Sequence, residues 1–316
     1  MGGAGLLSIG EPLVEFCQQG DDLIVGVGGD ALNVAARAAA HGLRSRLVCV
    51  LSPDALGEWL AGGIRALGVE LHARVGRGST GLYGIRTAVG GERSFSYWRF
   101  ETAAAELCSE DVKVMPEGFT ILFVSGITQA LSEEAELAID AAVASASRSG
   151  MVVAYDPNYR APLWAPRGGV EAARLAAERV LKQVDILLPS AEDCRLLWEL
   201  PDPREASKRL GGETAHVVVK SGPDGAWLNI DGRGIRVPGH PASHLVDTTG
   251  AGDAFTGVYL AGLARGLKEK MAAVRAVEVA SQTVTFPGAL RDLTHAGDPG
   301  STACPQDLSP DKPFSE

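Results

Sequence analysis

Two periodicities alternate along the chain. Short apolar runs, which predict buried strands, are separated by longer segments in which apolar residues recur every three or four positions, as in amphipathic helices. Because the strands are apolar throughout and alternate with helices, we expect an α/β fold whose parallel sheet is covered by helices on both faces. The predicted strands cover residues 6–10, 23–27, 46–52, 120–126, 151–156, 184–190 and 215–222. The predicted helices cover residues 30–43, 55–69, 132–150, 169–183, 191–200 and a segment that begins near residue 251.

Two further segments have the alternating pattern of hairpins. Residues 81–100 contain two alternating stretches on either side of Gly90-Gly91, and residues 226–238 contain two more around Asp231-Gly232. Glycine pairs and Asp-Gly favour tight turns, so both segments are predicted to be β-hairpins.

The end of the chain has a different composition. From about His295 onward it is rich in Pro, Ser, Asp and Gly, which is typical of flexible segments. We therefore expect one domain over residues 1–296 and a flexible tail over residues 297–316.

Composition narrows the choice of partners and compartment. The formal net charge is −10, whereas a nucleic-acid partner favours a basic face. Five cysteines lie far apart without a CxxC pair, which is typical of reduced thiols in a cytosolic protein. The first residues lack the pattern of a signal peptide, and no apolar run approaches the ~20 residues that a membrane helix needs. We expect a cytoplasmic protein that binds neither nucleic acid nor membrane.

The segment DTTGAGDAFTG, residues 247–257, carries the strongest chemical signal. Gly250, Ala251 and Gly252 precede a predicted helix, whose free N–H groups and positive dipole end attract anions, and the glycines let a phosphate approach the backbone. Asp253 would repel such an anion unless it accepts the proton of a hydroxyl that attacks the phosphate. The segment alone is equally compatible with a glycine-rich helix cap in which Asp253 complements the dipole.

Three other motifs bear on different functions. GVGGDA, residues 26–31, matches the GxGxxA dinucleotide fingerprint, with Asp54 near the distance expected for a ribose-binding acid, although the same glycines would also let a substrate hydroxyl approach the backbone. The P-loop pattern is missing, which argues against a P-loop NTPase. His240 and His244 are spaced by four residues, but Pro241 argues against the helix that metal ligation would need, so we expect no protein-held metal site.

Taken together, GVGGDALNVAARAAAHG and VDTTGAGDAFTGVYLAG resemble the two signatures of the ribokinase-like (PfkB) carbohydrate kinase family, and the likeness extends over roughly residues 6 to 290. SIGEPLVEF, SGITQALS, DPNYRAPLW and the YWR element resemble the branch that acts on 2-keto-3-deoxygluconate. The resemblance implies a three-layer α/β sandwich with a mostly parallel central sheet and a small β-sheet lid, here built from about residues 11–27 and 81–100. It also implies ATP and Mg²⁺ as cofactors and a homodimer or higher homo-oligomer formed through the lid, and it leaves a monovalent-cation requirement open.

The resemblance also assigns roles to individual residues. Asp253 matches the family's catalytic base, and the backbone of Gly250, Ala251 and Gly252 matches its anion hole. The sugar site maps onto Gly29, Asp30, Asn33, Tyr83, Tyr97, Arg99 and Arg160. The nucleotide site maps onto Asn158, Ser190, Lys220, Gly222 and Gly225. Many relatives carry Asn-x-x-Glu where this chain has Ser190 and Asp193, so Asp193 is expected to replace the glutamate in the magnesium-water contact.

A sugar-acid substrate requires local positive charge on an acidic protein. Arg99 ends a predicted lid strand beside Tyr97, and Arg160 follows a core strand, so we expect the two guanidinium groups to clamp the carboxylate and leave the terminal hydroxyl near Asp253. The predicted function is ATP-dependent phosphorylation of 2-keto-3-deoxygluconate to its 6-phosphate. The alternatives are a fructokinase or other neutral-sugar kinase of the same fold and, more remotely, a nicotinamide-dependent dehydrogenase.

Overall fold

A large mixed sheet forms the centre of the structure, a computed structural model that describes residues 4–19, 22–87, 93–214 and 216–294. In these residues the sheet has nine strands in the order β13-β12-β11-β10-β9-β8-β1-β4-β5. Its strands from β5 to β11 run parallel, and β12 and β13 add an antiparallel edge. The bounds are β1 Gly5–Ile9, β4 Arg44–Leu51, β5 Glu70–Val75, β8 Ile121–Ser125, β9 Val152–Asp156, β10 Ile186–Leu187, β11 His216–Lys220, β12 Gly225–Ile230 and β13 Arg233–Pro238.

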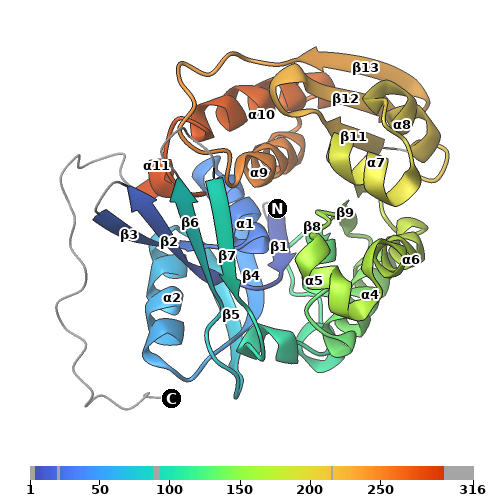
Figure 1. The fold of residues 1–316 in the computed structure, drawn as a ribbon. Helices are drawn as coiled ribbons and strands as arrows, with labels where there is room; N and C mark the ends of the chain where they lie inside the picture. The colour runs from blue at the N-terminus through green and yellow to red at the C-terminus, as the bar shows by residue number, and fades with distance from the viewer. Residues whose placement is uncertain (1–3, 20–21, 88–92, 215, 295–316) are drawn as a thin grey trace.

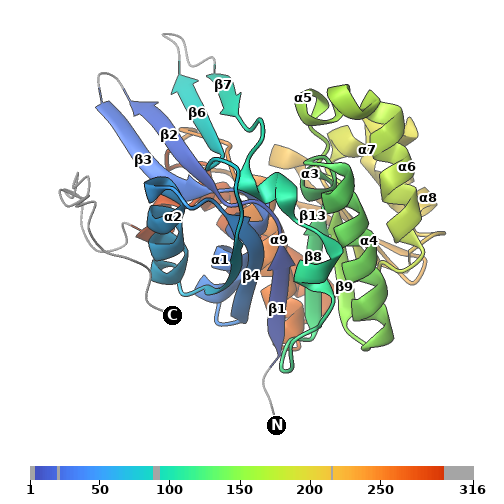
Figure 2. The same cartoon turned by 90° about the horizontal axis from the view of Figure 1, so that it is seen from below.

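Helices cover both faces of this sheet, as Figures 1 and 2 show. One face packs on α1 (Asp30–Ala40), α9 (Ala251–Ala264) and α10 (Glu269–Thr283). The other packs on α4 (Glu133–Arg148), α6 (Gly169–Leu181), α7 (Ala191–Trp198) and α8 (Pro203–Leu210). The predicted layered α/β architecture is therefore confirmed. The remaining helices are α2 Ala55–Ala66, the single turns α3 Gly126–Gln129, α5 Ala161–Trp164 and α11 Arg291–Thr294, and the 3₁₀ segments Ala103–Glu106, Ser109–Val112, Ala165–Arg167 and Gly222–Asp224.

A second sheet of four strands stands apart from the large one (Figure 2). Its order is β3-β2-β6-β7, with β2 parallel to β6 and the other pairs antiparallel. Leu13, Cys17, Tyr83 and Ile85 form its small buried cluster. This lid sheet lies where the resemblance placed it, although the predicted Gly90-Gly91 turn falls outside the described residues. The bounds are β2 Leu13–Gln19, β3 Asp22–Gly28, β6 Leu82–Thr87 and β7 Arg93–Trp98.

The sequence pattern and the structure differ at three strands and at helices α8 and α10. The pattern predicts no strand at β2, which only the resemblance includes in the lid, and no helix at α8 or α10. Strand β5 was not predicted, because most of its side chains are exposed at the edge of the sheet and it has no apolar run. The strand predicted over residues 184–190 is shortened to two residues, since Pro189 cannot donate to a neighbouring strand. The predicted tail over 297–316 lies outside the described residues. Among the residues that the structure describes, no helix is long and apolar enough to cross a membrane.

Close packing of α1 against α9 brings their N-terminal ends together at the carboxyl edge of the sheet. Gly257 makes this possible, because a Cβ atom there would lie 2.5 Å from the carbonyl oxygen of Val34 and 2.7 Å from Cβ of Arg37. Such separations are below any real carbon contact, so a larger residue would force the two helices apart.

We expect Gly257→Ala to lower the free energy of unfolding by about 1–3 kcal/mol through this overpacking. Gly62→Ala on α2 is the matched control, because nothing lies within 4 Å of the added Cβ. The control should leave stability unchanged or raise it by up to about 1 kcal/mol, since alanine is the better helix former. Urea denaturation measures both, and equal effects of the two substitutions would contradict the packing argument.

Candidate active site

The N-terminus of α9 forms an open turn. Gly250 caps the helix in the left-handed region at φ 74°, and a Cβ atom there would lie 2.7 Å from Cβ of Ala289. Gly252 is exposed, and a Cβ there would approach only the Nζ atom of Lys220, at 3.7 Å. The amide of Ala251 donates to the carbonyl of Thr248 at 3.2 Å, so this member of the predicted anion hole already has an acceptor within the turn. The turn offers backbone amides beside a lysine, which suits an anion.

Asp247 fixes this turn to the following part of the chain. One carboxylate oxygen accepts from the backbone and hydroxyl of Thr249, at 2.9 and 2.7 Å, and the other accepts from the amide of Gly288 at 2.8 Å. Sequence reasoning gave Asp247 no role in the site, although its place at the start of DTTGAGD is a usable signal, because an aspartate two residues before a turn commonly accepts from the turn's backbone.

Asp253 lies in the first turn of α9 and is partly buried. Its Oδ2 atom accepts from the side-chain amide of Asn33 at 2.8 Å, which joins α9 to α1. Burial raises the pKa of Asp253 to about 6, with a further rise from the charge of Asp30, while the Asn33 hydrogen bond and the charges of Lys220 and Arg160 lower it. A carboxylate with a pKa near neutrality is suited to accept and release protons.

Two buried oxygen acceptors beside Asp253 have no hydrogen-bond partner among the described residues. They are Oδ1 of Asp30 and Oδ1 of Asn33, both on the first turn of α1. The other oxygen of Asp30 accepts from the hydroxyl of Ser125 at 2.5 Å and from the side-chain amide of Asn158 at 3.5 Å. An unpaired buried acceptor costs about 1–3 kcal/mol, so the pair calls for a ligand that carries hydroxyl donors. The resemblance assigns Asn158 to the nucleotide site and Asp30 to the sugar site, yet the two side chains are in contact.

Gly29 brings the start of α1 close to the base of the lid. At φ 108° it adopts a conformation that other residues rarely reach, and a Cβ atom there would lie 2.2 Å from the carbonyl oxygen of Glu11. The glycine therefore lets the chain turn from lid strand β3 directly into α1.

The lid contributes aromatic and charged side chains that are held by glutamates. Tyr83 is buried and donates its hydroxyl to Glu15, and its ring stacks on that of Tyr97 with centroids 6.3 Å apart. The side chain of Arg99 is 6% exposed and forms an ion pair with the fully buried Glu11, to which its Nε donates at 2.6 Å. Neither glutamate was predicted, although both stand in the quoted SIGEPLVEF segment.

The two arginines of the predicted clamp differ in their surroundings. The positive charge of Arg99 is neutralised by Glu11, whereas Arg160 is exposed and, among the residues that the structure describes, donates only to the adjacent carbonyl of Tyr159, at 3.0 Å. The positive charge of Arg160 also lowers the pKa of Asp253, so the guanidinium lies within electrostatic range of that carboxylate.

Comparisons with known proteins show the family to which the chain belongs. Residues 15–296 match the model of the pfkB family carbohydrate kinases. The chain belongs to this family. It is similar to 2-dehydro-3-deoxygluconokinase of Dickeya dadantii (strain 3937), with 33% identity over 303 residues that cover 90% of this chain and 96% of the relative. The enzyme of the same name from Escherichia coli (strain K12) is 31% identical over 302 residues, which cover 89% of this chain and 95% of the relative.

Solved structures give the same fold. The crystal structure of 2-dehydro-3-deoxygluconokinase from Thermotoga maritima has 26% identity and a TM-score of 0.79 over 90% of this chain and 95% of that one. A fructokinase from Vibrio cholerae O395, in its fructose-, ADP- and calcium-bound form, has 24% identity and a TM-score of 0.82 over 92% and 96% of the two chains. The predicted ribokinase-like fold and the assignment to phosphotransferases that act on alcohols are thereby confirmed.

On the remaining side of the site, the kinase carries a buried ion pair. Lys220 at the end of β11 binds Asp156 at the end of β9, and the amide of Asn158 donates to Asp156 at 3.2 Å. Burial raises the pKa of Asp156 to about 7, and the charge of Lys220 opposes this rise. Asp156 was not assigned a role from the sequence, although it stands where a parallel strand ends, as residues at such a site usually do.

The loops near Lys220 are built from local turns. Gly222 and Gly225 both have positive φ, and a Cβ at Gly225 would lie 2.2 Å from the carbonyl oxygen of Val237. Between these glycines and Lys220, the hydroxyl of Ser221 is buried without a hydrogen-bond partner among the described residues.

Ser190 and Asp193 form a capping box at the start of α7. Asp193 Oδ2 accepts from the amide and hydroxyl of Ser190, at 2.8 and 2.6 Å, and its Oδ1 accepts from the amide of Tyr159 at 2.9 Å. Both oxygens of Asp193 therefore have partners in the protein. Within the described chain, no group of three or more His, Cys, Asp or Glu residues is arranged to hold a metal ion.

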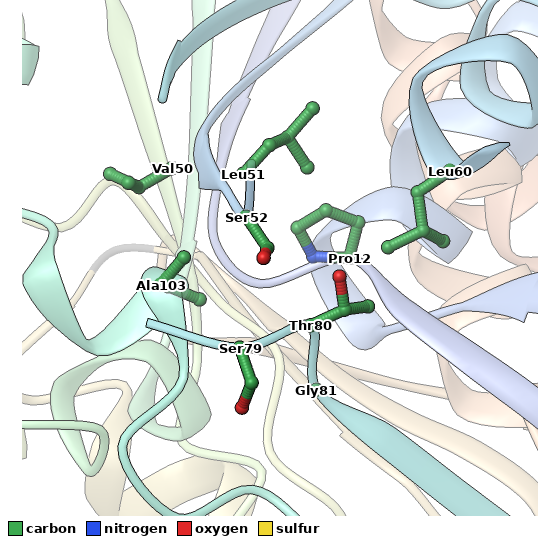
Figure 3. Close-up of a pocket in the computed structure, with 10 residues that line it drawn as sticks. Pro12, Val50, Leu51, Ser52, Leu60, Ser79, Thr80, Gly81 and Ala103 are labelled. Carbon is green, nitrogen blue, oxygen red and sulfur yellow. The ribbon is translucent and has the colours of Figure 1, made fainter. Parts of the chain in front are cut away.

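The dinucleotide interpretation of GVGGDA is wrong for this kinase. The strand that precedes the motif is β3 of the lid sheet rather than a strand of the parallel sheet, so the strand–loop–helix unit of a dinucleotide site is not formed. Asp54 caps α2 through the amide of Gly57 at 2.8 Å and accepts from the hydroxyl of Thr80 at 2.6 Å. Figure 3 shows the pocket beside it, between Pro12, Ser52 and Thr80. Its volume is about 10 Å³, which is room for no more than a water molecule.

Proposed function

We propose that this kinase transfers the γ-phosphoryl group of ATP to the terminal hydroxyl of 2-keto-3-deoxygluconate, also called 2-dehydro-3-deoxygluconate, to give the 6-phosphate. The observation that carries the proposal is the group of Asp253, Asn33 and Asp30. In it the carboxylate of Asp253 lies beside two buried side-chain oxygens that have no hydrogen-bond partner among the described residues. The relatives named 2-dehydro-3-deoxygluconokinase, at up to 33% identity over most of the chain, support the choice of sugar.

On the sugar side, hydroxyl groups would donate to Oδ1 of Asp30 and Oδ1 of Asn33, and Tyr83 and Tyr97 would cover the sugar from the lid. The exposed Arg160 is the main partner for the carboxylate, because its charge is free of an ion pair among the described residues. Arg99 would add a contact only through the edge of its guanidinium that Glu11 leaves open. The terminal hydroxyl would then lie at Asp253.

On the nucleotide side, Lys220 and the turn of Gly250, Ala251 and Gly252 would hold the phosphates at the positive end of α9. Asp253 accepts the proton as the hydroxyl oxygen attacks the γ-phosphorus in line and the bond to the ADP oxygen breaks. The turn stabilises the charge that develops on the transferred group. Mg²⁺ bound to the ATP phosphates would neutralise their charge, and Ser190 and Asp193 are the residues proposed to lie near its water shell. A monovalent cation is proposed only by likeness to the family.

Asp253→Asn should lower kcat by roughly 10²–10⁴-fold while ATP still binds, because the amide cannot accept the proton. In the wild type, kcat/KM should fall as the pH drops below about 6, the range in which Asp253 becomes protonated.

Asp253→Asn should also be more stable than the wild type at pH 8, by about 1–2 kcal/mol. The raised pKa of Asp253 means that the folded wild type loses stability as the pH rises from 3.8 to about 6, and the variant does not.

A coupled ADP-release assay and urea denaturation measure these effects. Asp231→Asn, in the exposed turn between β12 and β13, is the control and should change neither quantity. Undiminished turnover by Asp253→Asn would refute the role as base.

The choice of substrate is tested by a screen of hexonate-derived keto acids against fructose and other neutral hexoses. We expect the highest kcat/KM with 2-keto-3-deoxygluconate, and we expect Arg160→Ala to raise the KM for this acid about tenfold or more with little change in the KM for ATP, because a charge-assisted contact is lost. Arg195→Ala on the exposed face of α7 is the matched control. Preference for fructose, with no effect of Arg160→Ala, would instead establish the neutral-sugar alternative.

We further propose that two copies associate through exposed apolar side chains of the lid sheet. Leu23 and Val25 on β3 and Trp98 on β7 point to the same face by strand register, and they are 62%, 40% and 56% exposed. The double variant Leu23→Glu/Val25→Glu should therefore sediment as a monomer, and the wild type as a dimer. Leu137→Glu, at an equally exposed position on α4, is the control that should remain dimeric. A wild type that sediments as a monomer would exclude this interface.

A further inference from the structure

The segment of Gly288 and Ala289 is held against the phosphate-binding turn from several directions. The amide of Gly288 donates to Asp247 at 2.8 Å. A Cβ atom added to Gly250 would lie 2.7 Å from Cβ of Ala289. The carbonyl of Ala289 accepts from Arg37 of α1 at 2.9 Å. The position of this segment therefore determines the space in which Gly250 and the amides after it can lie.

The amide of Ala289 donates to Glu15 of the lid, at 3.3 Å from Oε2. The same oxygen accepts from the hydroxyl of Tyr83, its cross-strand neighbour on β6. Gly288 leaves room for this contact, because a Cβ atom there would lie 2.0 Å from Oε1 of Glu15. One carboxylate thus joins a lid residue of the proposed sugar site to the segment that supports the phosphate-binding turn.

The carboxylate is retained at a cost to folding. Glu15 is 6% exposed, and burial raises its pKa to about 7, with a further rise from Asp247, while its bonds to Tyr83 and Ala289 and the charge of Arg291 lower it. Because the pKa is raised, folding loses stability as the pH rises from 4.5 to about 7. Burial of a carboxyl group is unfavourable on its own, so the two contacts that Glu15 makes, with Tyr83 of the lid and with Ala289, are the feature that points to a role.

We propose that Glu15 is a positioning residue that couples the lid sheet to the phosphate-binding turn of α9. The inference rests on the proposed phosphoryl transfer at Asp253. When a sugar seats against Tyr83, the bond from Tyr83 to Glu15 and the bond from Ala289 to Glu15 hold the Gly288–Ala289 segment in one place, and this segment holds Gly250. The coupling is reciprocal, so nucleotide bound at the turn strengthens sugar binding under the lid.

Three substitutions at one position test the proposal. Glu15→Ala removes the shared acceptor, and Glu15→Asp withdraws it by one methylene. Both should therefore lower kcat by about tenfold to a hundredfold and raise the sugar KM and the ATP KM together, by the factor of the coupling that is lost. Glu15→Gln keeps an oxygen that can accept both bonds, so it should retain at least about half of the wild-type kcat. It should also be more stable than wild type at pH 8 and show a smaller gain at pH 5, because it removes the buried charge.

Calorimetry gives a second readout that structural damage alone would not produce. The non-hydrolysable analogue AMP-PNP with Mg²⁺ should bind the wild type more tightly in the presence of the sugar than in its absence. In Glu15→Ala this enhancement should disappear while AMP-PNP alone binds as in the wild type. If Glu15→Ala does not fold, Glu15→Asp is used for the same measurement.

Three results would overturn the proposal. The first is a kcat of Glu15→Ala and Glu15→Asp within twofold of the wild-type value. The second is an increase in the sugar KM alone, which would make Glu15 a direct sugar contact. The third is a loss of kcat in Glu15→Gln equal to that in Glu15→Ala. Failure of the proposed substrate is seen separately, as a wild type that does not phosphorylate 2-keto-3-deoxygluconate. The same variants are then compared on the sugar that the screen identifies.

Discussion

The close approach of α1 and α9 is the constraint on which the rest of the site depends. Asn33 and Asp253 are separated by 220 positions in the chain, yet their side chains meet at 2.8 Å because Gly257 lets the two helices pack backbone to backbone. This contact places the residues of α1 that we propose to bind the sugar beside the turn of α9 that we propose to bind the phosphates. A phosphoryl transfer needs both at once, since the attacking hydroxyl and the phosphorus must be held in line.

The electrostatics of the site follow from burial more than from charge pairing. Asp253, Asp156 and Glu15 all have raised pKa values, and in each the largest cause is desolvation. Lys220 and Arg160 oppose this effect at Asp253 without cancelling it. The result is a group of buried carboxylates with raised pKa values, set beside the few cations that two anionic substrates would need in a protein with a net charge of −10.

The lid is attached to the large domain through glutamates that local sequence reasoning did not single out. Glu11 neutralises Arg99 and accepts from Thr102, so the arginine that was expected to clamp the substrate is also part of the lid's own framework. Glu15 connects Tyr83 to Ala289. Both contacts span long distances in sequence, and a charged residue in a strand gives no local indication of whether it will face water or a partner.

The sequence by itself determined the layered α/β architecture, the lid hairpin, the helix start at Gly250 and the family, because periodicity, turn residues and glycine-rich helix starts are local signals. It did not determine the edge strand β5, whose exposed side chains follow no apolar pattern, or the surroundings of Arg99 and Asp193, whose charges are satisfied within the protein. The tertiary structure alone decided which acceptors remain unpaired and which carboxylates are buried. These properties depend on packing between distant segments, which no local pattern records.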